Sequence, residues 1–159
     1  MAKIYIYNLI WNEEKSDFQP INPRHIHWVY SKRGNVGKSI FVKWLAINKP
    51  ETIIKISFGT PNQLRSSLIA AGPKKCYFLD IPKTKNSNED NLDNILSIIE
   101  DAKLGFLVSN FYDNYKTLIM DPPLIFIFSN DECLVDKLSE DRWQVFRINK
   151  KDFTLTKMH

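Results

Sequence analysis

Residues 31–40, SKRGNVGKSI, have the types and spacing that could bind a phosphate chain. In a phosphate-binding loop, backbone amides and the N-terminus of the following helix face the phosphates. The lysine reaches the β- and γ-phosphates, and the serine hydroxyl ligates Mg²⁺. We therefore predict a nucleotide site formed by Gly34, Asn35, Val36, Gly37, Lys38, Ser39 and Ile40.

The loop departs from the usual pattern G-x-x-x-x-G-K-[ST] at its first position, where this chain has Lys32. The glycine at that position mainly eases a turn, and Gly34 can ease it instead. The alternative is a chance Gly-Lys-Ser in a surface turn. A strand-like run before the loop and an amphipathic helical run after it favour phosphate binding.

An acid and an amide end two other apolar runs. Asp80 follows CYFL, and Asn130 follows LIFIFS. An acid at a strand end can hold Mg²⁺ together with Ser39, and an amide there can hydrogen-bond the γ-phosphate or the attacking water. Each residue type is also an ordinary turn former. Only in combination with the loop do we predict Asp80 as a metal ligand and Asn130 as a catalytic residue.

The elements that must position these residues alternate along the chain. Helical spacing appears in residues 39–48, 61–71 and 88–102. Short apolar runs rich in β-branched and aromatic residues predict strands at 26–30, 52–57, 75–81, 124–130 and 144–148. This alternation is typical of an α/β domain with a mainly parallel central sheet flanked by helices. Residues 105–120 interrupt it, and we predict an inserted β-hairpin there.

Length and composition are those of one globular domain. Of the 159 residues, 43% are hydrophobic and 25% are charged, and no apolar run approaches the roughly 20 residues that span a bilayer. The net charge of +4 permits a polyanionic partner without requiring one. The two cysteines have no partner-like spacing, and the N-terminus lacks the pattern of a secretory signal. We expect an intracellular protein with no membrane partner.

The first 22 residues are harder to interpret. KIYIYN alternates as a strand does, and a charged stretch, NEEKSD, follows it. We predict a domain over residues 23–159. Residues 1–22 would then form an N-terminal segment that is part of a linker or of an oligomerisation region.

The order of these motifs resembles the helicase domain of replication-associated (Rep) proteins of circular, Rep-encoding single-stranded DNA viruses and related plasmids. The segments that carry the resemblance are WVYSKRGNVGKS, YFLDIPKT, IIEDAKLGFLVSNFY, MDPPLIFIFSN and KLSEDRWQVFRI. It extends from about residue 24 to residue 148, most of the chain. The resemblance implies a superfamily 3 helicase, a P-loop NTPase with an AAA+-like fold. Such proteins usually form hexameric rings that bind ATP between subunits, although an isolated domain can remain a monomer.

The resemblance also implies roles for single residues. Lys38 and Ser39 match the Walker A residues, Asp80 the Walker B acid, and Asn130 the polar residue of motif C. Arg142 is the candidate arginine finger, which would stabilise transition-state charge at a neighbour's ATP. The alternative for Arg142 is a structural pair with Glu140 or Asp141.

The hairpin would line the pore of the ring and contact single-stranded DNA through charge and stacking. The predicted contacts come from Lys103, Phe111, Tyr112 and Lys116, with Tyr115 as a further stacking candidate. The family tends to carry a lysine before a tyrosine here, whereas this chain has Phe111-Tyr112, so its main DNA-binding lysine stays unassigned. The alternative is that these aromatic side chains pack beneath the hairpin.

Two catalytic features are missing from this sequence, one found in many ATPases and one in full-length Rep proteins. Ile81 follows Asp80 where many ATPases carry a second acid, so the residue that activates water is unidentified. The endonuclease domain uses a histidine pair and a tyrosine with a lysine three residues later. His25 and His27 open the strand before the phosphate loop and are better explained as strand residues, and no tyrosine here has that lysine. Nicking chemistry is therefore not expected.

The function predicted from the sequence is an ATP- and Mg²⁺-dependent helicase or translocase on single-stranded DNA in rolling-circle replication. If the protein is viral, it would act in the host nucleus. Two alternatives stay open, a catalytically weak module that binds nucleotide and nucleic acid and a helicase that acts on RNA. A small-molecule kinase has less support because the arginine-rich helical lid of such enzymes is absent.

Overall fold

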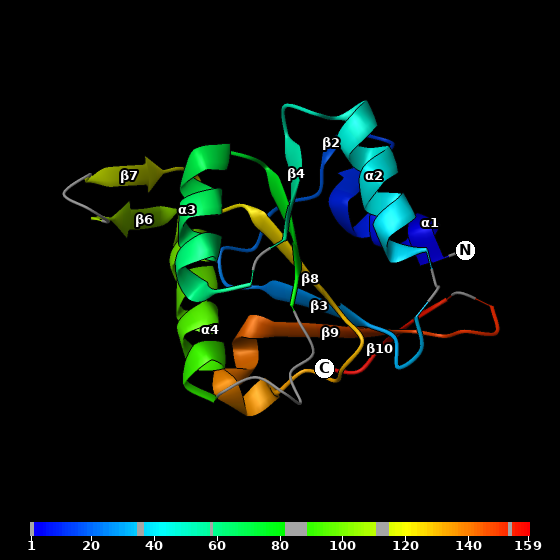
Figure 1. Cartoon of the computed structure of the whole chain (residues 1–159). Helices are drawn as coiled ribbons and strands as arrows, with labels where there is room; N and C mark the ends of the chain where they lie inside the picture. Colours follow the sequence, from blue (N-terminus) through cyan, green and yellow to red (C-terminus); the bar gives the residue numbers. More distant parts are fainter. Residues whose placement is uncertain (1, 35–36, 58, 82–88, 111–114, 153) are drawn as a thin grey trace.

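The centre of the molecule is a sheet that orders its strands β10-β9-β3-β8-β5-β4 (Figure 1). The computed structural model describes residues 2–34, 37–57, 59–81, 89–110, 115–152 and 154–159. In these residues the sheet has six strands, of which β10 alone is antiparallel to its neighbour. Their bounds are β3 Ile26–Tyr30, β4 Ile53–Ser57, β5 Cys76–Asp80, β8 Leu124–Ser129, β9 Trp143–Ile148 and β10 Leu155–Lys157. The predicted α/β fold with a mainly parallel sheet is confirmed.

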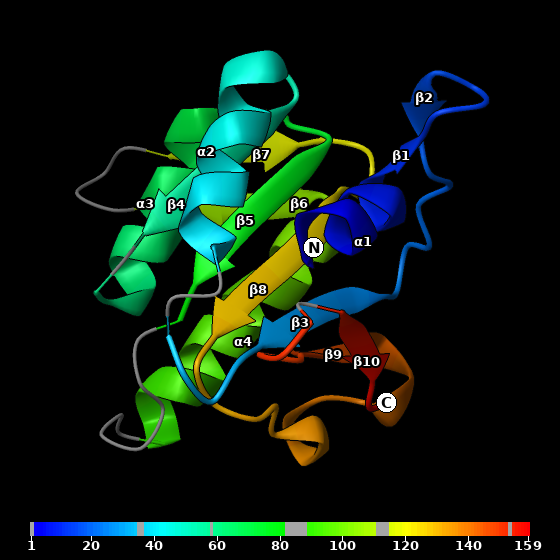
Figure 2. The ribbon, with the colours of Figure 1, turned by 90° about the vertical axis from the view of Figure 1, so that its right-hand side faces the viewer.

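Helices cover both faces of this sheet, as Figures 1 and 2 show. One face carries α1 (Ala2–Ile10) and α2 (Lys38–Asn48), and the other carries α3 (Pro61–Ala71) and α4 (Glu89–Leu104). The start of α3 follows from local chemistry, because the Thr60 hydroxyl accepts from the Gln63 amide and the Gln63 side chain accepts from the Thr60 amide.

The core consists of two apolar clusters separated by the sheet. On the α3/α4 face, Leu64 and Leu68 pack with Ile95, Ile99 and the alternate residues of β3, β5 and β8. On the α1/α2 face, the other alternate strand residues meet the buried side chains of α1 and α2. All six residues of β8 are buried, as expected for a parallel strand covered on both sides.

The first residues form a helix rather than the strand that their alternation suggested. Ile6 and Ile10, four residues apart, lie on one side of α1 and are fully buried against the sheet. Two short strands follow, β1 (Trp11–Asn12) and β2 (Asp17–Phe18), paired antiparallel. The chain adopts the helical alternative, in which Ile6 and Ile10 lie about one turn apart on the buried side.

The predicted hairpin is present as β6 (Phe106–Ser109) and β7 (Lys116–Ile119), which pair antiparallel. It projects from the helical layer of α3 and α4 (Figure 1). Gly105 connects α4 to the hairpin with a left-handed φ of 86°, and its carbonyl accepts from the Met120 amide at 2.9 Å. Two short 3₁₀ turns, η3 (Val135–Lys137) and η4 (Glu140–Arg142), connect β8 to β9.

Candidate functional site

A cavity of about 590 Å³ lies where β3, β5 and β8 end. Its lining comes from the predicted loop and from the ends of β5 and β8: Gly34, Gly37, Lys38, Ser39, Ile40, Asp80, Ile81, Phe128, Ser129 and Asn130. The topology explains this gathering, because β8 lies between β3 and β5 and the three strands are parallel. Ligands of open α/β sheets bind at the carboxyl ends of such strands, where the strand order reverses.

The loop enters α2 through a conformation that glycine favours. Gly37 has φ 81° at the N-cap of α2, and its carbonyl accepts from the Phe41 amide at 3.0 Å. No side chain caps this helix end, so its first amide groups and its positive dipole end face the cavity region. Asn35 and Val36, also predicted for this loop, lie outside the described residues.

Lys38 and Asn130 are in direct contact. The Lys38 ammonium donates to the Ser129 carbonyl at 3.1 Å and to the Asn130 side-chain oxygen at 3.3 Å. Burial lowers the pKa of Lys38, and the Asp80 carboxylate opposes part of this shift. Because both of its acceptors are neutral, this partly desolvated ammonium can exchange them for the oxygens of a phosphate that enters the cavity.

Asp80 lines the same cavity but has a partner that sequence reasoning missed. Its carboxylate accepts from the Lys55 ammonium at 2.8 Å, and Lys55 comes from the neighbouring strand β4. The signal in the sequence was a lysine in the apolar run TIIKIS, two residues after the buried Ile53 and therefore on the same face. Two lysines and one aspartate thus share this corner of the site.

Ser39 and Ile40 are exposed at the cavity mouth, and 76% of the Ile40 residue surface is accessible. Among the described residues, no group of three or more His, Cys, Asp or Glu side chains is placed to hold a metal ion. The hydroxyl of Ser39 and the carboxylate of Asp80 are two oxygen donors that line the cavity and could hold a cation. Mg²⁺ in phosphate-transfer sites is commonly held by one or two protein oxygens and the substrate phosphates.

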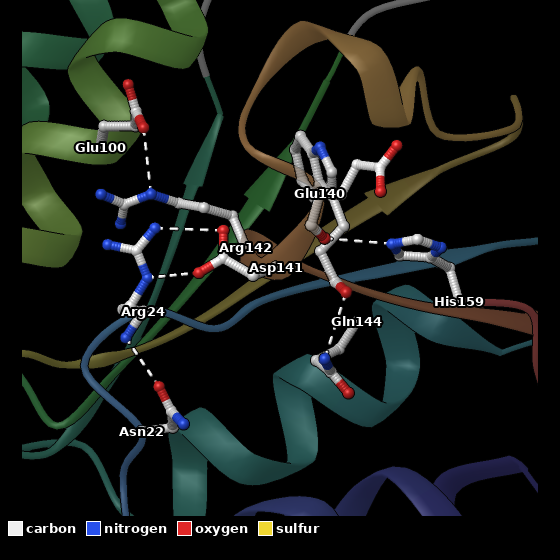
Figure 3. A network of polar contacts seen from close by, with 9 residues as sticks. Asn22, Arg24, Glu100, Glu140, Asp141, Arg142, Gln144 and His159 are labelled. Carbon is white, nitrogen blue, oxygen red and sulfur yellow. Dashed lines mark hydrogen bonds and ion pairs between the residues drawn. The ribbon is translucent and has the colours of Figure 1, made fainter.

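Arg142 lies at the other end of the parallel strands. In the register of the sheet, Trp143 pairs with Ile26, whereas the predicted phosphate loop follows Tyr30. The Arg142 guanidinium forms an ion pair with Glu100 of α4, at 3.1 Å between Nε and Oε1 (Figure 3). Its partner is therefore neither of the two acids weighed from the sequence.

Asp141 pairs instead with Arg24 through two contacts, one of which is 3.1 Å long (Figure 3). The pair connects the segment before β3 to the turn before β9. It helps fix the position of this turn, and therefore of Arg142, although both side chains are about half exposed.

Lys103 lies in the core, which does not agree with its prediction as a nucleic-acid contact. It is fully buried, and its ammonium donates to the Pro123 carbonyl at 2.5 Å. Its position near the end of α4 turns the side chain toward the segment between β7 and β8 and not toward solvent. Sequence spacing alone could not distinguish a lysine that is exposed on the approach to a hairpin from one that is turned into the core.

Replacing Lys103 with methionine is expected to change how stability depends on pH. Burial lowers the pKa of Lys103 from 10.5 to about 8. Between these values the unfolded chain binds the extra proton, so stability rises with pH. Relative to the variant, the wild type should gain up to about 3 kcal/mol of unfolding free energy over this range. Urea unfolding at several pH values measures the difference.

The matched control is Lys116→Met, because Lys116 is exposed on β7. Its stability curve should run parallel to that of the wild type. Parallel curves for Lys103→Met as well would contradict the assignment of a buried charge to Lys103.

Two of the hairpin residues predicted to contact nucleic acid can be compared with the structure. Lys116 and Tyr115 are both exposed, with 71% of the Tyr115 residue surface accessible. Phe111 and Tyr112 lie outside the described residues. Proteins commonly bind single strands with such exposed residues, because a lysine attracts the backbone phosphates and an aromatic ring stacks on a base.

The two histidines of β3 and its approach do not form a site. His27 stacks against Phe126, with ring centroids 4.5 Å apart, and burial lowers its pKa to about 4. A neutral, stacked imidazole agrees with the prediction that His27 is a strand residue.

Two curated proteins match this chain over most of its length. Para-Rep C6 of Subterranean clover stunt C6 alphasatellite is 29% identical over 140 residues, which are 86% of this chain and 46% of that protein. Para-Rep C3 of Milk vetch dwarf C3 alphasatellite is 28% identical over 138 residues, which are 84% of this chain and 43% of that protein.

The chain is similar to Para-Rep proteins of alphasatellites. It spans less than half the length of these two Para-Rep proteins. No protein-family model matches the sequence. Among the helices of the described residues, none is both long and apolar enough to cross a bilayer.

Proposed function

We propose that the chain is an ATP- and Mg²⁺-dependent helicase or translocase domain that moves along single-stranded DNA in rolling-circle replication. It would be a P-loop NTPase of superfamily 3 with an AAA+-like fold. The observation that carries the proposal is the cavity at the ends of β3, β5 and β8, where Lys38 contacts Asn130 and Asp80 lines the same wall. The similarity to Para-Rep proteins supports the replication role.

Each residue at the cavity has a role that follows from its contacts. Lys38 would leave the Ser129 carbonyl and Asn130 to neutralise the β- and γ-phosphates. Asn130 would then be free to orient the attacking water. The amides at the start of α2 would bind the phosphate oxygens.

The donor set fits a magnesium ion that is shared with the nucleotide. Ser39 and Asp80 would hold it, and the bound ion would neutralise charge on the phosphates. For this, Asp80 must give up or share its ion pair with Lys55. Lys55 is then close enough to the cavity to contribute a second positive charge.

The proposed partners follow from two parts of the molecule, the exposed hairpin and the turn that precedes β9. We propose that the hairpin contacts single-stranded DNA through Lys116 and Tyr115, with Phe111 and Tyr112 as further contacts. Arg142 would act as an arginine finger in a neighbouring copy, in a ring that we expect to be hexameric. Because it precedes β9, Arg142 is far from the loop of its own chain, and its pair with Glu100 would have to open. The protein would be intracellular, in the host nucleus if it is viral.

A second candidate is a module that binds nucleotide and nucleic acid but hydrolyses little. The ion pair between Asp80 and Lys55 favours it, because this pair competes with the metal ion. Ile81, which follows Asp80 and lines the cavity, offers no group that can activate water. An RNA strand would suit either candidate as well as DNA does.

Steady-state phosphate release, measured with and without a single-stranded oligonucleotide, tests the proposal. Light scattering on the same samples gives the mass. We expect hydrolysis that needs Mg²⁺, increases with the DNA strand and increases with protein concentration as copies assemble. Nucleotide binding with no phosphate release under any of these conditions would favour the binding module. Equal stimulation by RNA and DNA would mean that the domain does not distinguish between the two kinds of strand.

A further inference from the structure

A second cleft, of about 220 Å³, lies beside the phosphate loop, and we call it the basic cleft. It is lined by Ser31, Lys32, Arg33, Arg147, Ile148, Asn149 and Lys150. One wall is the segment between β3 and the phosphate loop, and the other is the end of β9. The register of the sheet brings these walls together, because Tyr30 pairs with Arg147. The described linings of the basic cleft and of the larger cavity share no residue.

Hydrogen bonds hold both walls in place. The Ser31 hydroxyl donates to the Arg33 carbonyl at 2.6 Å, and the Ser31 amide donates to the Ser129 carbonyl at 3.3 Å. On the other wall, the Asn149 side chain contacts the hydroxyls of Thr154 and Thr156, each at 2.8 Å. The cations of the cleft are thus carried on ordered backbone, which lowers the entropy cost of binding an anion.

The basic cleft carries more positive charge than its surroundings neutralise. Lys32 pairs with Glu132 at 2.8 Å. The described residues offer no ion-pair partner to Arg33, Arg147 or Lys150, all of which are exposed.

The acids near the cleft are already engaged. Glu132 raises the pKa of Lys32, while Arg147 acts against this shift, so these charges interact. In the turn beyond the cleft, the Asp152 carboxylate accepts from the amide and hydroxyl of Thr154, and exposed Lys151 adds another cation. Five cations, Lys32, Arg33, Arg147, Lys150 and Lys151, therefore stand against the three carboxylates of Asp131, Glu132 and Asp152 in this region. Such a surface attracts phosphate oxygens, and its two arginines can each bind them with two donors.

We propose that the basic cleft binds the sugar–phosphate backbone of a single-stranded nucleic acid. The cations are exposed, so the ligand approaches from solvent, and no aromatic ring belongs to the described lining. Contacts to a backbone by charge, without base stacking, are what this lining can make. The site is separate from the hairpin, because the end of β9, where Arg147 pairs with Tyr30, and the hairpin lie on opposite sides of the molecule (Figure 1).

The double variant Arg147→Ala, Lys150→Ala tests this proposal. Its binding to a fluorescent oligothymidylate is measured by anisotropy over a series of salt concentrations, without nucleotide. Two lost phosphate contacts should reduce the slope of log K against log salt by about 1.4 and weaken binding about tenfold near 0.15 M salt. The matched control is Lys15→Ala, Lys75→Ala, which removes two exposed lysines outside the cleft and should keep the wild-type slope.

Wild-type slope and affinity in the cleft variant would overturn the proposal, as would a wild type that does not bind the oligonucleotide. ATP binding, measured separately with a fluorescent analogue, should be unchanged by the cleft variant. If it weakens while the salt slope stays the same, the cleft serves the nucleotide and the proposal is wrong. This test does not depend on the role proposed for Lys38, because the strand-binding measurement contains no nucleotide.

Discussion

The Lys38→Ala variant is expected to lose ATP hydrolysis by about 100-fold or more. The ammonium of Lys38 is a positive charge at the cavity wall, where it donates to the Ser129 carbonyl and to the Asn130 side-chain oxygen. Without it, the charge that develops on the transferred phosphate has no partner from the loop. Phosphate release at saturating ATP measures the loss, and nucleotide titration separates it from weaker binding.

The matched control is Lys43→Ala. Lys43 is exposed on the same helix, and it does not line the cavity. It should hydrolyse ATP at the wild-type rate. Both variants should unfold at nearly the wild-type urea concentration, because the lost hydrogen bonds of Lys38 lie at a partly exposed site. Equal rates in Lys38→Ala and the wild type would remove the loop from the proposed chemistry.

The second large effect is expected from Gly105→Ala, which should cost about 4 kcal/mol of unfolding free energy. A Cβ atom added at Gly105 would lie 2.0 Å from the Met120 carbonyl oxygen, and the residue has φ 86°. That oxygen belongs to backbone at the end of β7, so it cannot rotate away. The hairpin must shift or separate from α4. Urea unfolding followed by circular dichroism measures the cost.

Gly72→Ala separates the two causes of this effect. Gly72 also has a left-handed φ, of 72°, but an added Cβ would meet no atom within 4 Å. With ψ −173° its backbone lies in a region essentially restricted to glycine, so the substitution should cost about 1 to 3 kcal/mol from backbone strain alone. If Gly105→Ala costs no more than Gly72→Ala, the close approach of Met120 to Gly105 is not a constraint on the fold.

Much of the fold could be predicted because its strands are buried on both faces. The apolar runs have no polar alternation. The structure places a strand at 26–30 with the predicted bounds, and the strand predicted at 124–130 ends one residue earlier, at 129. The helix at 61–71 was also predicted with its bounds, from its helical spacing, and the structure shows that a proline and a capping pair mark its start. The N-terminal helix was missed because KIYIYN fits both a period of two and a helical spacing.

The site could be predicted only for residues that lie at or just after the end of a predicted strand. Lys38, Asp80 and Asn130 come together because parallel strands end at the same edge. The pairing of Lys55 with Asp80 was missed because the sequence of β4 does not indicate which strand lies beside it. Strand order depends on the whole sheet. Lys103 was misinterpreted for a related reason, since only tertiary packing determines that α4 turns it inward.

Strand β8 connects the hairpin to the end of the molecule where we propose that phosphate binds. Four residues, two of them prolines, join β7 to β8, and the far end of β8 supplies the Ser129 carbonyl that Lys38 contacts. Because its six residues are packed on both sides, the strand cannot bend or compress appreciably. Its six residues span about 20 Å. A displacement of the hairpin along this axis would therefore also shift the Ser129 carbonyl that contacts Lys38.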